Sequence, residues 1–187
     1  MGMGEPLLNQ KAVFEAVERL IDPAWFNLSG AHVTVSTVGI APGMLAFTER
    51  LPTCRLALSL HSARQSVRER IMPQARKHPL PVLKEALEQA VTRGTVMIEY
   101  LLLKNLTDRP EDLSALVDFI GNLPVHVNLI PFNSFVGSNL AGTSQENCKI
   151  ISDELKNKGL SVTLRRSLGV DIMAACGQLV QHKLKID

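Results

Sequence analysis

The stretch Val96-Met97-Ile98-Glu99-Tyr100-Leu101-Leu102 is a short, mostly aliphatic run between two segments with helical periodicity. Runs of this length and composition are typical of buried strands in parallel sheets. Comparable runs occupy residues 33–36, 56–60, 125–130 and 161–164. We therefore expect all of these runs to be strands of one sheet.

Segments with helical spacing separate the expected strands. Residues 10–20 place Val13, Phe14, Val17 and Leu20 on one face. Residues 81–92, 110–122 and 144–158 repeat this spacing. Because strands alternate with helices, the pattern predicts an α/β fold, with a parallel sheet, right-handed crossovers and helices outside.

The composition excludes several classes of protein. The 187 residues carry a formal net charge of +2, which is no signature of nucleic-acid binding, and 45% of them are hydrophobic. No apolar run approaches the ~18 residues that a membrane span requires, and the first residues do not form a signal peptide. Three scattered cysteines indicate a reducing compartment. We therefore expect a cytoplasmic protein without membrane contact.

Basic residues gather in one stretch, which contains Arg64, Arg68, Arg70, Arg76 and Lys77. Phosphate contacts require such groups. A solvated helix face gives the same pattern, and from the sequence alone it is the favoured interpretation.

Polar residues stand where the expected strands end. Ser36 ends the first run, Ser59-Leu60-His61 ends the second, and Asn133 follows the fourth. The carboxyl ends of parallel strands meet at one edge, where α/β proteins keep their ligand sites. Taken singly, these residues are more typical of a strand-end hydroxyl, a buried histidine and a turn former. As a set, we expect them to converge on one ligand.

Two further motifs flank this set. The chain begins with Met1-Gly2-Met3-Gly4-Glu5-Pro6, in which glycines permit close approach to a ligand and a carboxylate can accept from an ammonium group. Near the other end, Ala174-Ala175-Cys176-Gly177 surrounds a thiol with small residues. Singly, the two features are more typical of a turn and of a buried structural cysteine.

In this order and at these spacings, the motifs resemble the RlmN/Cfr family. Its members are radical S-adenosylmethionine (SAM) enzymes that methylate an adenosine of large-subunit ribosomal RNA. The resemblance implies that SAM is bound by Gly4, Glu5, Ser36, Ser59, Leu60, His61 and Asn133. It also implies that Cys176 is catalytic: its thiolate takes a methyl group from one SAM, and a 5′-deoxyadenosyl radical from a second SAM abstracts hydrogen from that S-methyl group.

The family's [4Fe–4S] cluster is held by a Cys-x-x-x-Cys-x-x-Cys loop upstream of the Gly-Glu-Pro motif. Here Cys54, Cys148 and Cys176 are far apart, and no two of them have ligand-like spacing. We therefore expect no metal ligands in this chain. We interpret it as the C-terminal part of a larger enzyme, or as the product of an internal start codon.

The resemblance also refines the expected fold. Residues 1–187 should form a single domain, a partial (β/α) barrel of the radical SAM type that lacks the first β/α unit and the N-terminal domain. One sheet edge should then be exposed, and exposed edges promote association. Expressed alone, the chain should therefore aggregate or behave as a loose globule.

Two functions follow. The leading one is radical methylation of C2 or C8 of adenine in 23S-type rRNA, with tRNA left open as a further substrate and with a flavodoxin- or ferredoxin-type electron donor as partner. The alternative is a truncated, non-catalytic paralogue that keeps only SAM or RNA binding. Met173 favours the alternative, because many members have an acidic residue there, whereas retention of Cys176 and the SAM motifs opposes it.

Overall fold

The computed structural model describes residues 4–133 and 139–165, which fold around one parallel sheet. Short 3₁₀ turns and helices alternate with the strands. The elements are η1 (Pro6–Leu8), α1 (Gln10–Ile21), η2 (Gly30–His32), β1 (Thr34–Thr37), α2 (Ala41–Arg50), β2 (Arg55–Ser59), α3 (Gln65–Ile71), η3 (Pro73–Arg76), α4 (Leu80–Val91), β3 (Thr95–Leu102), α5 (Pro110–Ile120), β4 (His126–Pro131), α6 (Gln145–Asn157) and β5 (Ser161–Leu164).

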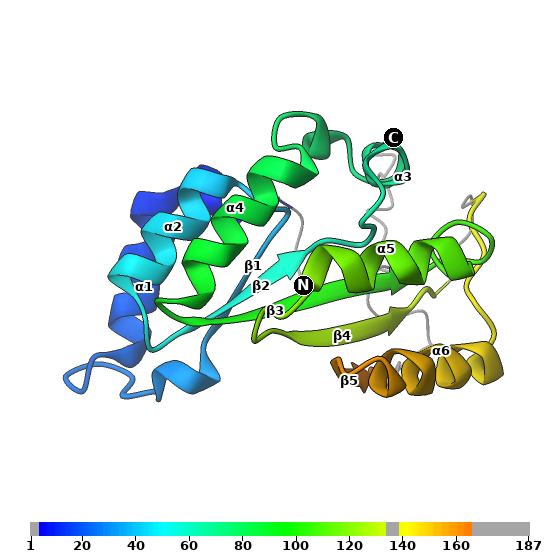
Figure 1. The fold of residues 1–187 in the computed structure, drawn as a ribbon. Coiled ribbons are helices and arrows are strands. Elements are labelled where there is room, and N and C mark those ends of the chain that lie inside the picture. Colours follow the sequence, from blue (N-terminus) through cyan, green and yellow to red (C-terminus); the bar gives the residue numbers. More distant parts are fainter. Residues whose placement is uncertain (1–3, 134–138, 166–187) are drawn as a thin grey trace, which may run out of the picture.

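The sheet has five strands in the order β1-β2-β3-β4-β5, and every neighbouring pair is parallel. This order confirms the predicted α/β fold, and each predicted strand is found within one residue of its expected bounds. Helices α1 and α2 lie at one end of the sheet and α6 at the other, and α4 lies beside α2 (Figure 1). All carboxyl ends of the strands therefore lie at the same edge.

The two faces of the sheet differ in chemistry. One face belongs to the main core, in which the alternate residues Val96, Ile98, Tyr100 and Leu102 of β3 pack with helix side chains such as Leu87. The residues between them in β3 include Met97 and Glu99. We refer to the face that carries Glu99 as the polar face.

Two helices were missed by the sequence analysis, α2 and α3. The first turn of α2 contains Pro42 and Gly43, residues that are also typical of a turn. Pro42 is tolerated there because the first turn of a helix has no use for its missing N–H. Gly43 is required by packing, because a Cβ at this position would lie 2.8 Å from Leu7 Cβ. Helix α3 covers only 7 residues, too few for a clear helical period.

The ends of α6 follow the sequence signals closely. Ser144 is the N-cap, and its Oγ accepts from the N–H of Asn147 at 3.3 Å. Gly159 follows the helix with φ 88°, a left-handed conformation that favours glycine. Within the described part of the chain, no helix is long and apolar enough to cross a membrane.

Candidate SAM-binding site

Glu5 joins the amino-terminal turn to the carboxyl end of β1. Its Oε1 accepts from Thr37 Oγ1 at 2.7 Å and from the N–H of Leu7 at 3.0 Å. Its Oε2 accepts from the N–H of Val38 at 2.7 Å. A carboxylate offers about four acceptor positions, so one remains for a further donor such as an ammonium group. Glu5 is therefore a structural tie that retains some capacity for a ligand.

The hydroxyls of Ser36 and Ser59 meet across β1 and β2. Their oxygens lie 3.3 Å apart, within hydrogen-bond distance. Both residues line a cavity of about 690 Å³ that Gly4 and Glu5 also line. This volume lies within the ~300–1,000 Å³ typical of small-molecule sites. The cavity thus brings together four of the seven residues that the sequence analysis assigned to SAM.

Leu60 and His61 form a tight turn directly after β2. Both backbone N–H groups donate to the carbonyl of Glu99, each at 3.1 Å. His61 has φ 57°, which is uncommon outside glycine and asparagine. These two residues are not among the described residues that line the cavity. Their backbone N–H groups bind the turn to β3 and are therefore already used.

The imidazole of His61 is held in its neutral form. Burial, and secondarily the positive charge of Arg68, lower its pKa from 6.5 to about 4. Its Nδ1 is buried and has no hydrogen-bond partner among the described residues. At neutral pH the side chain therefore offers a dipole and not a charge.

Glu99 and Asn128 form a polar pair that the sequence analysis did not assign. They are register partners on β3 and β4, and Asn128 Nδ2 donates to both carboxylate oxygens of Glu99, at 3.2 and 3.1 Å. Glu99 is only 8% exposed. Ser59 is the register partner of Glu99 on β2, so the pair extends the Ser36–Ser59 hydroxyls along the polar face. A lone carboxylate within the apolar run 96–102 was the signal that could have identified it.

The remaining assigned residues are placed as follows. Asn133 comes two residues after β4 and is not among the described lining residues of the cavity. Cys176, the assigned methyl carrier, lies outside the described residues, as does Met173.

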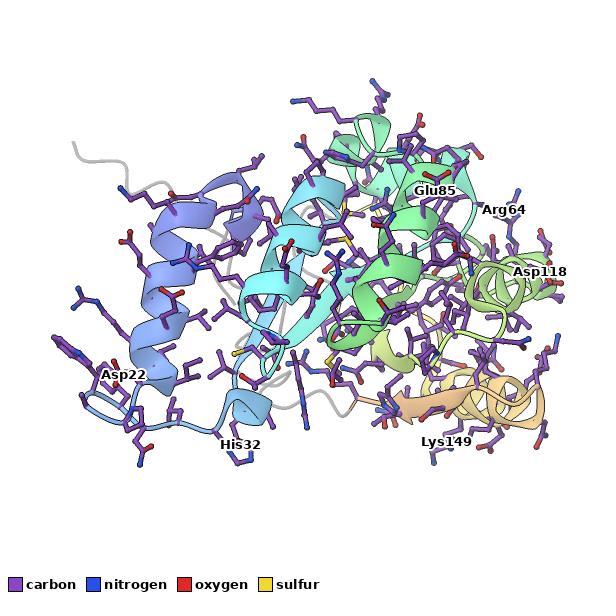
Figure 2. The ribbon with its side chains drawn as sticks, turned by 60° about the vertical axis from the view of Figure 1, so that its left-hand side comes forward. Asp22, His32, Arg64, Glu85, Asp118 and Lys149 are labelled. Carbon is purple, nitrogen blue, oxygen red and sulfur yellow. The ribbon has the colours of Figure 1, made fainter. Side chains whose placement is uncertain are left out.

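The basic stretch divides into one buried cation, Arg68, and cations at the surface, among them Arg70, Arg76 and Lys77. Arg68 is 0% exposed, which excludes both an RNA contact and a solvated position for it. Arg64 lies at the outer edge of the molecule (Figure 2) and donates to Asp112 of α5 at 2.9 Å. Arg70 is exposed, and Arg76 lies 3.8 Å from Glu69.

The described cysteines do not fit a cluster or a redox role. Cys54 and Cys148 are each 1% exposed, and burial raises the pKa of both thiols. Among residues 4–133 and 139–165, no group of three or more histidine, cysteine or acidic side chains could hold a metal ion. The described residues therefore supply no ligand set for a [4Fe–4S] cluster.

Comparison with known proteins supports the SAM interpretation. The chain is 47% identical to a probable RNA methyltransferase of Rhodopirellula baltica over 186 residues, which is 98% of this chain and 49% of the relative. It is 41% identical to a probable dual-specificity RNA methyltransferase RlmN of Thermus thermophilus, covering 96% of this chain and 51% of the relative. The chain thus spans about half the length of the curated relatives it matches. No protein-family model matches it.

Solved structures agree with these relatives. A radical SAM methyltransferase from Sphaerobacter thermophilus superposes with a TM-score of 0.89 at 33% identity, covering 95% of this chain and 53% of that one. A domain of a pyruvate-formate lyase-activating enzyme from Bacteroides vulgatus has a TM-score of 0.67 at 19% identity, covering 89% of this chain and 97% of that one, and shows similarity of fold alone. These comparisons confirm the resemblance inferred from the motifs.

Proposed function

We propose that this chain forms the SAM-binding part of an enzyme that methylates an adenosine in RNA. The chain is homologous to about half of an RlmN-type radical SAM RNA methyltransferase. Large-subunit rRNA is the proposed substrate, at C2 or C8 of adenine, and tRNA is a second candidate. Such an enzyme requires an electron donor, for which a flavodoxin- or ferredoxin-type protein is proposed.

One observation carries the proposal most directly. The dipeptide Gly4-Glu5 is far in the sequence from Ser36 and Ser59, yet all four residues line one cavity beside the carboxyl ends of β1 and β2. They were assigned to SAM from the motifs alone. The remaining acceptor position of Glu5 suits the ammonium group of SAM, because a carboxylate and an ammonium form a charge-assisted hydrogen bond.

The chain's own residues would hold the ligand and carry its methyl group. SAM, when bound, supplies the methyl group and, on reduction, a radical. The Ser36 and Ser59 hydroxyls can each donate or accept, so they suit the polar part of the ligand. The Cys176 thiolate would accept a methyl group on its sulfur before that carbon is passed to adenine. The cluster ligands are proposed to lie outside this chain.

The test uses the full-length natural polypeptide loaded with iron and sulfide. It is incubated with SAM carrying a deuterated methyl group, a reductant and a large-subunit rRNA transcript, and the nucleosides are analysed by mass spectrometry. We expect a methyladenosine whose position distinguishes C2 from C8. Cys176→Ala should abolish methylation and leave SAM affinity largely unchanged.

Cys148→Ala is the matched control, because it removes a buried cysteine from α6 rather than the proposed methyl carrier. It should retain methylation if the protein folds. Substantial methylation by Cys176→Ala would overturn the methyl-carrier assignment. SAM binding by the wild type without any RNA methylation would instead support the non-catalytic paralogue.

A further inference from the structure

Arg68 is a buried cation that the proposed function leaves unexplained. It is 0% exposed and is the largest of the fully buried side chains among the described residues. Burial lowers its pKa to about 10, so it remains charged at neutral pH. Removing a charge from water is unfavourable unless hydrogen-bond partners compensate. An apolar side chain would fill the same volume at a lower desolvation cost. The guanidinium is therefore explained by the hydrogen bonds that it donates.

The partners of Arg68 are backbone carbonyls from three separate connections. Its Nη2 donates to Val38 O at 2.6 Å, its Nε to Leu60 O at 3.2 Å, and its Nη1 to His78 O at 3.3 Å. Val38 follows β1, Leu60 follows β2, and His78 precedes α4. Gly39 permits this approach, because a Cβ there would lie 3.3 Å from Nη2.

The residues that carry two of these carbonyls each make a further hydrogen bond through their own N–H group. The N–H of Val38 donates to Glu5 Oε2, while its carbonyl accepts from Arg68. The N–H of Leu60 donates to the Glu99 carbonyl, while its own carbonyl accepts from Arg68. One side chain therefore fixes the turns after β1 and β2, the strands that carry the Ser36–Ser59 hydroxyl pair.

We propose that Arg68 is a positioning residue for the methionine end of SAM, holding Glu5 and the strand-end turns in the geometry that binds the ammonium and carboxylate groups. This inference rests on the proposed function. It predicts a selective defect. Loss of Arg68 should lower the affinity for ligands that carry the methionine end more than the affinity for ligands that lack it. A residue that merely stabilised the fold would weaken both equally.

The test compares SAM with 5′-methylthioadenosine, which has the adenosine and the sulfur but no amino-acid group. Affinities are measured by calorimetry on the full-length, cluster-loaded protein with Arg68→Met, Arg68→Lys and Arg70→Met. Arg70 lies on the same helix and is exposed, so its variant is the matched control. Thermal unfolding checks that each variant is folded.

Arg68→Met should weaken SAM about tenfold or more, which corresponds to about 1.4 kcal/mol, and 5′-methylthioadenosine less than about threefold. Arg68→Lys keeps the charge but cannot reach three carbonyls from one planar group, so its SAM affinity should be intermediate. Arg70→Met should match the wild type for both ligands.

Unchanged SAM affinity in Arg68→Met, or an equal loss for both ligands, overturns the proposal. So does failure of both Arg68 variants to fold, because Arg68 would then be a residue of the fold alone. Absence of SAM binding by the wild type would contradict the proposed function itself, which is a separate result.

Discussion

Glu5 is a structural tie, and a ligand contact is proposed for its remaining acceptor position. From the sequence, a carboxylate after glycines predicted a contact with the ammonium group of SAM. The structure adds three donors from within the chain, at Leu7, Thr37 and Val38. The sequence could not reveal this tie, because it joins residues about thirty positions apart through folding. The contact between Glu5 and the ammonium group stays a prediction. One acceptor position of the carboxylate is left for it.

His61 makes stability depend on pH in a definite direction. Its pKa is about 4 in the folded chain and near 6.5 when unfolded, so the unfolded chain binds more protons between these values. Stability should therefore fall as pH drops from about 6.5 to about 4. The variant His61→Asn removes the pH-dependent contribution of this histidine to the free energy of unfolding. Asparagine tolerates the positive φ.

Urea unfolding of wild type and His61→Asn at several pH values across this window checks the prediction. The difference in unfolding free energy between the two proteins should change with pH, because the carboxylates common to both cancel. His32→Asn alters an exposed histidine and is the control. A wild-type pH profile that His61→Asn reproduces would contradict the assignment.

At the scale of elements, the strands were predictable and two helices were not. Aliphatic runs bounded by turn residues identified all five strands, because burial on the helix side selects such residues over a short length. Helix α2 was hidden by Pro42-Gly43, which the packing against Leu7 explains only once the fold is known. The sequence predicted buried strands, and β3 is buried at five of its eight residues, with Met97 and Leu101 half-buried.

In the turn between β1 and α2, position 39 should tolerate no side chain. Gly39 has φ 98°, and a Cβ there would lie 2.8 Å from Leu83 Cδ1. Gly159 has a similar φ of 88°, but a Cβ there would meet nothing within 4 Å. Both alanine variants should lose about 1–3 kcal/mol from the backbone conformation. Gly39→Ala should lose more, because it adds the clash.

The two glycine variants are compared by urea unfolding under identical conditions. Their difference isolates the cost of the close contacts at Gly39, of which Leu83 is the nearest, since the backbone cost is shared. Equal losses would show that the leucine moves aside without cost. The result would then count against a tightly packed turn at the candidate site.

At the scale of the whole molecule, one face of the sheet supports the fold and the other carries polar groups. Asn128→Leu should remove the amide partner of the buried Glu99 carboxylate and cost about 1–3 kcal/mol. The double variant Glu99→Leu with Asn128→Leu should recover much of that loss, because no buried polar group is left without a partner.

Unfolding free energies of the wild type, both single variants and the double variant form a complete cycle. Additive losses would show that the two side chains do not act as a pair. Methylation by the full-length protein is measured in parallel. Methylation should not return with stability in the double variant, because the polar face would have lost its carboxylate and its amide.

The division of labour between the two faces also bears on how such a protein can change over generations. Because successive residues of β3 alternate between the faces, selection for a folded chain and selection for a particular chemistry act on interleaved positions. A lineage can therefore alter the polar face through every second residue of a strand, while the neighbouring residues keep the core intact.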